Sequence, residues 1–292
     1  MASLKEIRGR IGSIRNIAQI TRAMEMVAAS RMKRAQDAIL AARPYDDELR
    51  AVLSRVAAAA PEEASPLLAV RPVKRVALIA ITTDRGLVGS LNANAVRTVL
   101  RYVADRKERE PDVEVELITV GRKGREALRR SGIPISAHFP GAGDRPSFGS
   151  VTPIARLVTE DFLTGKYDEI DVEYSAFVST LTQRPEVRQL LPIERPELGE
   201  HEHRTNDEYL FEPSPQEVLS HLLPHFVAVD LYRAVLENNA SEQSAQMISM
   251  RNATDNAHEL IEDLTLVYNK TRQANITREM TEIASGAEAL AG

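Results

Sequence analysis

The C-terminal stretch, residues 214–290, predicts one very long helix, and no other feature of the sequence constrains the fold as strongly. Ser214 can accept a free backbone N–H at the start, and Pro215 suits the first helical turn. Pro224 predicts a kink, but no proline follows it and no glycine appears before Gly286. At about 1.5 Å per residue, such a helix is on the order of 110 Å long, several times a domain radius. Most of it is therefore expected to project from any globular body.

Apolar and small residues recur along this stretch in steps of three and four, the spacing that holds one helix seam against a partner helix. The seam residues are Met247, Met250, Thr254, Ala257, Ile261, Leu264, Tyr268 and Thr271. A second row repeats every seven residues, at Ala253, Leu260, Val267 and Ala274. The seam predicts a partner helix elsewhere in the chain.

The N-terminal residues supply that partner. The three-four rhythm runs from Leu4 to Ile39 and is interrupted only by Glu25. A second apolar row lies at Ile17, Ile20, Met24 and Val27. Residues 1–40 carry eight basic and three acidic side chains, whereas residues 238–292 carry four basic and eight acidic ones. The two terminal segments share the same three-four spacing and carry opposite net charge. Together these features predict an antiparallel coiled coil whose two helices are connected by the middle of the sequence.

The middle of the chain changes its period. Strands are predicted at 73–82, 113–120 and 133–138, and an alternating apolar pattern at 170–178 predicts the final strand. Helices are predicted between them at 93–106, 124–130 and 152–164, and residues 192–206 are predicted to be a loop. Alternation of strands and helices indicates an α/β fold with a central, mostly parallel sheet flanked by helices. The expected divisions are an N-terminal coiled-coil helix (1–60), a Rossmann-like α/β domain (70–208) and a C-terminal coiled-coil helix (209–292).

Composition excludes several classes of protein. There is no cysteine, which excludes disulfides and thiol metal sites and suggests a reducing compartment. No apolar run approaches the roughly 18 residues that cross a bilayer, so the chain is expected to be soluble or peripheral to a membrane. The net charge is −5 and only 4% of residues are aromatic, which argues against a base-stacking surface for nucleic acid. The basic N-terminal helix could bind DNA phosphates, but its interleaved Ile and Met favour a protein partner.

Two glycine-containing turns are candidates for phosphate binding, at 82–92 and at 121–124, since each follows a predicted strand. Neither matches a P-loop or a dinucleotide-binding motif, so ordinary turns are the preferred interpretation. Glu217, His221 and His225 have the spacing of metal ligands on a helix, but a solvated face is preferred, also for His201 and His203 in the charged loop. No catalytic grouping stands out. We therefore predict no enzyme activity of its own, no cofactor, no metal and no small-molecule substrate.

Three separate stretches resemble one family. They are residues 20–32 (ITRAMEMVAASRM), residues 84–87 (DRGL), and the C-terminal residues 274–283 (ANITREMTEI) with 286–290 (GAEAL). Together they are similar to the gamma subunits of F-type ATP synthases, and the resemblance covers the whole chain. Val88 and Ser90 stand where that family often has Cys and Gly, and Gln246 where it often has Arg.

The resemblance implies a central rotor shaft that couples ion flow through a membrane c-ring to ATP synthesis or hydrolysis. The expected partners are an alpha3beta3 hexamer, the epsilon subunit and the c-ring, with catalysis in the beta subunits and a peripheral location on the cytoplasmic side of a bacterial membrane. It also implies contacts with the hexamer at Met24, Arg31, Arg272 and Gln273, and a foot of the shaft near Tyr209 and Glu212. Two alternatives stay open: a coiled-coil adaptor with a nucleotide-sensing α/β domain, and a DNA-associated coiled coil.

Overall fold

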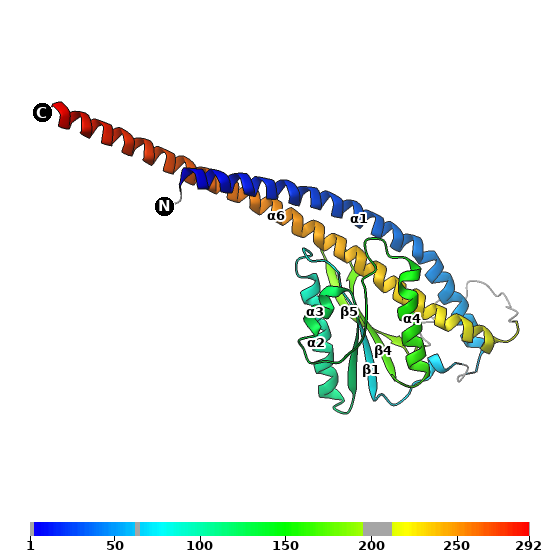
Figure 1. Ribbon diagram of the computed structural model, residues 1–292. Coiled ribbons are helices and arrows are strands. Elements are labelled where there is room, and N and C mark those ends of the chain that lie inside the picture. The colour runs from blue at the N-terminus through cyan, green and yellow to red at the C-terminus, as the bar shows by residue number, and fades with distance from the viewer. Residues whose placement is uncertain (1–2, 62–64, 195–211, 292) are drawn as a thin grey trace. The chain divides into compact units, whose positions relative to one another are not determined.

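The computed structural model describes residues 3–61, 65–194 and 212–291. Contacts divide the chain into two compact units, residues 1–28 with 247–292, and residues 29–246. The long helices α1 (Leu4–Ala59) and α6 (Pro215–Ala291) contribute segments to both units (Figure 1). Pro44 and Pro224 lie inside these helices, and neither one ends its helix. The two predicted terminal helices are therefore present, each as one continuous element.

The first unit pairs the beginning of α1 with the later part of α6. The predicted seam is buried or half-buried on both helices, and its buried residues include Ile7, Ala18 and Ala28 on α1 and Met250 and Ala257 on α6. Most members of the second rows are exposed: Ile17 (52%), Ile20 (59%), Val27 (51%), Leu260 (51%) and Val267 (50%). The heptad pattern thus predicts which side chains lie between the helices. Most residues of the second rows are exposed to solvent in the isolated chain.

Polar contacts across the seam set its direction and register. The hydroxyls of Thr21 and Thr254 lie 2.7 Å apart. The Arg251 Nε donates to Glu25 Oε1 at 3.0 Å. Nearer the N-terminus, Arg8 donates to the Tyr268 hydroxyl. Because rising residue numbers on α1 meet falling numbers on α6, the pair is antiparallel, as predicted.

Glu25, the one interruption of the apolar rhythm, is buried in this seam. Burial alone would raise the pKa of its carboxyl, but hydrogen bonds from Arg251 and Arg22 outweigh this effect and hold the pKa below its ordinary value. A carboxylate with a lowered pKa stabilises the fold above its ordinary pKa, and this stabilisation is lost as the pH falls through the folded-state value.

We expect Arg251→Gln to lower the free energy of unfolding by about 1–2 kcal/mol at neutral pH, because Glu25 keeps only one cationic partner inside the seam. The loss should shrink as the pH falls below the ordinary carboxyl pKa and through the lower folded-state value, because Glu25 is protonated first in the unfolded chain and then in the folded one. Urea unfolding followed by circular dichroism measures the difference. Arg278→Gln, an exposed arginine on the same helix, is the matched control. An equal loss in both variants would contradict the role given to the pair.

The second unit is built on a five-stranded sheet in the order β3-β2-β1-β4-β5. The parallel strands are β1 (Arg75–Ile81), β2 (Glu114–Val120), β3 (Ile135–Phe139) and β4 (Glu169–Phe177), and β5 (Gln183–Leu191) is antiparallel to β4. The other elements are α2 (Leu91–Arg109), α3 (Arg122–Leu128), α4 (Phe148–Leu163) and a short 3-10 helix, η1 (Pro66–Leu68). The mostly parallel sheet flanked by helices confirms the predicted α/β fold (Figure 1).

The prediction that the run at 170–178 is the final strand is wrong, because β5 follows it. Pro185 and alternating charges within β5 give it little of the apolar signal of a strand. The strand lies at the edge of the sheet, where a proline can be accommodated. Of the predicted loop at 192–206, residues 192–194 are neither helix nor strand and the rest lie outside the described residues.

Two apolar layers sandwich the sheet. On one face, the buried Val76 and Leu78 of β1 pack with Val99 and Val103 of α2. On the other face, Ala77 and Ile79 pack with α4 and with the segments of α1 and α6 that belong to this unit. Alternate side chains of one strand point to opposite faces, so a strand covered on both sides is apolar throughout.

β4 departs from this rule. Three carboxylic acids alternate with its apolar residues and lie on the α2 side of the sheet: Glu169, Asp171 and Glu173. Arg106 donates to Glu169 at 2.6 Å, and the Tyr102 hydroxyl donates to Asp171. Glu173 is 0% exposed, and neither of its carboxyl oxygens has a hydrogen-bond partner among the described residues. The sheet therefore contains a buried acid without a hydrogen-bond partner among the described residues.

Candidate functional site

The sheet has its topological switch point between β1 and β4, where the strand order reverses. Ligands of open α/β sheets commonly bind at the carboxyl ends of the strands at such a point. The crevice at this edge of the sheet lies at the ends of β1 and β2, has a volume of about 80 Å³, and includes Asp84, Asp144 and Glu242 in its lining. Burial raises the pKa of Glu242 to about 7, and the charges of Asp144 and Asp84 act in the same direction. Arg31 and Arg85 pair with Asp144, so the cations near the crevice are already engaged. The carboxylates in the lining would repel a phosphate group, so the crevice is not suited to bind one.

The glycines of the second candidate turn, 121–124, have packing roles. A Cβ on Gly121, whose φ is +91°, would lie 2.2 Å from the backbone oxygen of Thr82. A Cβ on Gly124 would lie 2.5 Å from the Thr82 side chain, and the Gly124 N–H donates to the Thr82 hydroxyl at 3.0 Å. These glycines let the ends of β1 and β2 approach closely. At 121–124 the structure thus favours an ordinary turn over a phosphate loop.

The histidine spacing on α6 does not form a metal site. No group of three or more His, Cys, Asp or Glu suited to a metal occurs within the part of the chain that the structure describes. His225 instead lies 2.6 Å from the Tyr45 hydroxyl of α1, measured from its Nε2. His201 and His203 lie outside the described residues.

The residues expected to contact partners lie mainly on the surfaces of the long helices. Met24 is half-buried and lies between the exposed Ile20 and Val27 along α1, whereas Arg272 and Gln273 are exposed. Glu212 is exposed, and Tyr209 lies outside the described residues.

Arg31 differs from these residues. Its guanidinium pairs with Asp144 at 2.9 Å, and its side chain is 26% exposed. A contact with another subunit would therefore have to share or replace this pair. Sequence reasoning missed the partner, because Asp144 is far away along the chain.

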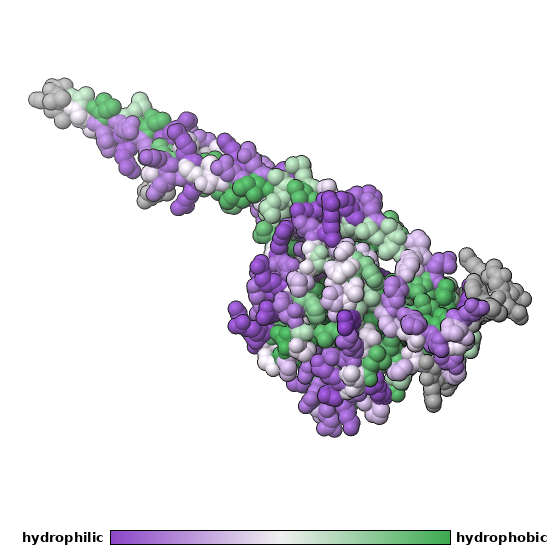
Figure 2. All heavy atoms as spheres, turned by 45° about the vertical axis from the view of Figure 1, so that its right-hand side comes forward, coloured by the Kyte–Doolittle hydropathy of each residue, from purple (hydrophilic) through white to green (hydrophobic). Residues whose placement is uncertain are grey.

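The last part of α6 has no partner helix among the described residues. From 272 to 287 every side chain is exposed except the half-buried Asn275. Large apolar residues are among the exposed ones: Ile276 (48%), Met280 (67%) and Ile283 (72%). Figure 2 shows apolar side chains interspersed among hydrophilic ones along the C-terminal part of α6. Exposed apolar rows of this length are typical of a surface that another protein covers.

No helix within the described ranges is both long enough and apolar enough to span a membrane.

Known proteins match this chain along its whole length. A family model described as ATP synthase matches residues 3–290. The "ATP synthase gamma chain" of Roseiflexus castenholzii is 54% identical over 293 residues, which cover 100% of this chain and 99% of the relative. Among solved structures, a chain of the Tetrahymena thermophila mitochondrial ATP synthase central stalk and c-ring is 26% identical, with a TM-score of 0.60, covering 80% of this chain and 99% of that one. A chain of the Euglena gracilis mitochondrial ATP synthase, at 20% identity and a TM-score of 0.71, shares the fold and covers 98% of this chain and 94% of its own.

Proposed function

Because this chain belongs to the family of ATP synthase gamma chains, we propose that it is the rotating central shaft of an F-type ATP synthase. In this role it couples ion flow through a membrane c-ring to ATP synthesis or hydrolysis in an alpha3beta3 hexamer. The observation that carries the proposal is the whole-chain match at 54% identity to a gamma chain. The unpartnered apolar rows of α1 and α6 support it, because a hexamer around the helices would cover them.

The helices supply what a shaft needs mechanically. A continuous antiparallel pair, tied by buried contacts such as Thr21 with Thr254, resists twisting better than one helix or a loop. Contacts with the surrounding ring must break at each step, so weak exposed pairs of about 0–1 kcal/mol suit the outer surface. A surface that differs around its circumference stabilises a different state in each catalytic subunit, and this difference couples rotation to nucleotide affinity.

In this proposal the chain is not catalytic, and the nucleotide chemistry belongs to the beta subunits. The carboxylate-lined crevice at the strand ends supports this assignment over a nucleotide-sensing domain. The helical parts, 1–60 and 209–292, would serve as the shaft, and 70–208 would be the domain that meets epsilon and the c-ring. The location would be peripheral, on the cytoplasmic side of a bacterial cell membrane.

We propose contacts with the hexamer at Met24 and Arg31 on α1 and at Arg272 and Gln273 on α6. The exposure of Arg272 and Gln273 supports this role most directly. Tyr209 and Glu212 are proposed to lie at the foot of the shaft, toward epsilon and the c-ring.

The direct test is co-purification. A tagged copy extracted from membranes in mild detergent should bring down alpha, beta, epsilon and c subunits in fixed stoichiometry. The matched control is the same tag on a chain ending at residue 246, which lacks the α6 part of the first unit. Recovery of the tagged full chain without any ATP synthase subunit would refute the proposed function.

We expect Ile17→Glu combined with Ile20→Glu to keep the isolated chain in solution while reducing its assembly with alpha and beta by at least about tenfold. Both side chains are more than half exposed in the chain alone, so the charges cost little there. In the complex the same charges would be buried without partners. Light scattering and assembly yield measure the two effects. Asn16→Glu with Gln19→Glu, at exposed polar positions of the same helix turns, is the control.

A further inference from the structure

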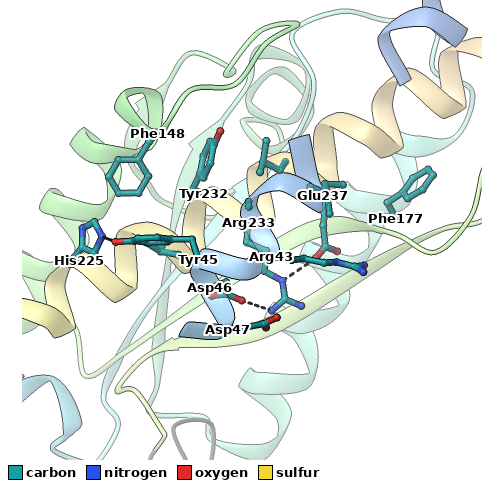
Figure 3. A pocket seen from close by; sticks show the side chains of 14 residues that line it. Arg43, Tyr45, Asp46, Asp47, Phe148, Phe177, His225, Tyr232, Arg233 and Glu237 are labelled. Atoms are coloured by element: carbon teal, nitrogen blue, oxygen red, sulfur yellow. Dashed lines mark hydrogen bonds and ion pairs between the residues drawn. The ribbon is translucent and has the colours of Figure 1, made fainter. Parts of the chain in front are cut away.

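A cavity of about 740 Å³ lies within the second unit, between α1, α4, α6 and the end of β4 (Figure 3). Its volume falls within the roughly 300–1,000 Å³ of pockets that hold small molecules. The proposed function as a rotor shaft does not require this cavity.

One end of the cavity is aromatic. It presents Tyr45 of α1, Phe148 of α4, and His225 and Tyr232 of α6 (Figure 3). The Phe148 ring centroid lies 5.5 Å from that of His225 and 5.7 Å from that of Tyr232. The Tyr45 hydroxyl bonds to His225, and the Tyr232 hydroxyl donates to the backbone oxygen of Pro146 at 3.3 Å. Interlocked rings from three helices form a preorganised aromatic wall, and the faces of such rings carry negative potential.

The other end is ionic, with more carboxylates than guanidinium groups. Its charged residues are Arg43, Asp46, Asp47, Arg233 and Glu237. Arg233 is already held by Glu237 at 3.2 Å and by Asp46 at 3.5 Å. Asp46 also binds Arg50, yet its Oδ1 has no hydrogen-bond partner among the described residues. The lining therefore carries one negative charge in excess, together with an unsatisfied carboxylate oxygen.

We propose that this cavity binds a small organic cation with an aromatic body. The ring would stack in the aromatic end, and the cationic group would lie near Asp47 and Asp46, where both the ring faces and the carboxylates favour positive charge. An anion would be repelled by the carboxylate excess, and a neutral molecule would leave that charge uncompensated. The occupant would contact α1, α4 and α6 together and so stabilise the second unit through binding. This inference does not depend on the rotor role.

The test uses the full chain at low micromolar concentration and three probes that share one ring system. These are the (2-naphthylmethyl)trimethylammonium cation, neutral 2-naphthylethanol and the 2-naphthylacetate anion. Saturation-transfer NMR with ligand titration measures binding. We expect the cation to bind at least about tenfold more tightly than either of the others. Equal binding of all three, or no binding of the cation, would overturn the proposal.

Matched variants locate the site. Phe148→Leu and Asp47→Asn should each weaken cation binding several-fold. Their controls are Phe139→Leu, a half-buried phenylalanine on the same core but outside the cavity, and Glu48→Gln, the exposed neighbour of Asp47. The control pair reproduces the loss of one ring and of one negative charge. If the control variants weaken binding as much as the cavity variants do, the cation binds elsewhere and the proposal fails.

Discussion

Oxidation of a cysteine pair, one at Arg272 or Gln273 and one in the facing loop of a beta subunit, will stop ATP turnover, and reduction will restore it. Both positions on α6 are exposed and lie beyond the part of the helix that pairs with α1. A disulfide forms when the two Cα atoms approach within about 7 Å, and it ties the shaft to one of three equivalent subunits. Because the chain has no native cysteine, each introduced thiol is the only one it contributes. ATP hydrolysis before oxidation, after oxidation and after reduction gives the result, with at least about 90% inhibition expected once cross-linking is complete.

Inhibition alone does not distinguish blocked rotation from a distorted catalytic subunit. The control is an exchange experiment in which the beta subunits of one complex carry two different tags. The disulfide is formed, reduced, followed by many turnovers and formed again. A rotor will then be paired with beta subunits that it did not start on. Recovery of only the original pairing would mean that the chain is static, whereas loss of activity without oxidation would identify damage by the substitutions.

Replacement of the buried acid in the sheet, Glu173→Gln, will make the second unit much less sensitive to pH. Burial raises the pKa of Glu173 to about 8 from its ordinary value of 4.5. The folded state therefore holds a proton that the unfolded chain releases, and stability is full below the ordinary pKa and falls as the pH rises through 8. Each pKa unit corresponds to about 1.4 kcal/mol, so we expect the variant to be more stable than the native chain by about 3 kcal/mol near pH 7. At pH 4 the two should be equally stable, because a neutral acid and an amide have similar size.

Urea unfolding at several pH values, compared between the two chains, measures this difference. Asp171 lies on the same strand face, and burial raises its pKa to about 7. Its contribution is common to both chains and cancels in the comparison. Glu108→Gln, an exposed glutamate on α2, is the control and should leave the pH profile unchanged. A constant stability difference between pH 4 and pH 9 would mean that Glu173 is ionised in the folded chain, contrary to its unpartnered burial.

The sequence by itself determined the long helices, their pairing and the family. Heptad spacing identifies seam residues such as Ala18 and Met250 because a helix repeats its faces at a fixed interval, so a local pattern suffices. The strand β1 was predictable for a similar reason, since both faces of an inner parallel strand are covered and its residues after Arg75 are all apolar. The family motifs at both ends are local as well.

Only the tertiary structure decided what depends on residues far apart in the chain. Glu25 interrupts the apolar rhythm in the sequence, and it is tolerated in the seam because Arg251, more than two hundred residues away, neutralises it. β5 has a weak apolar signal because its place at the sheet edge removes the requirement for one. Glu173 shows the limit most clearly: alternation on β4 indicates a strand with one polar face, and the packing of α2 over that face of the sheet buries the acid. Whether a side chain is buried depends on the residues packed around it. The sequence reveals those residues only where a local repeat, such as a heptad, indicates the packing face.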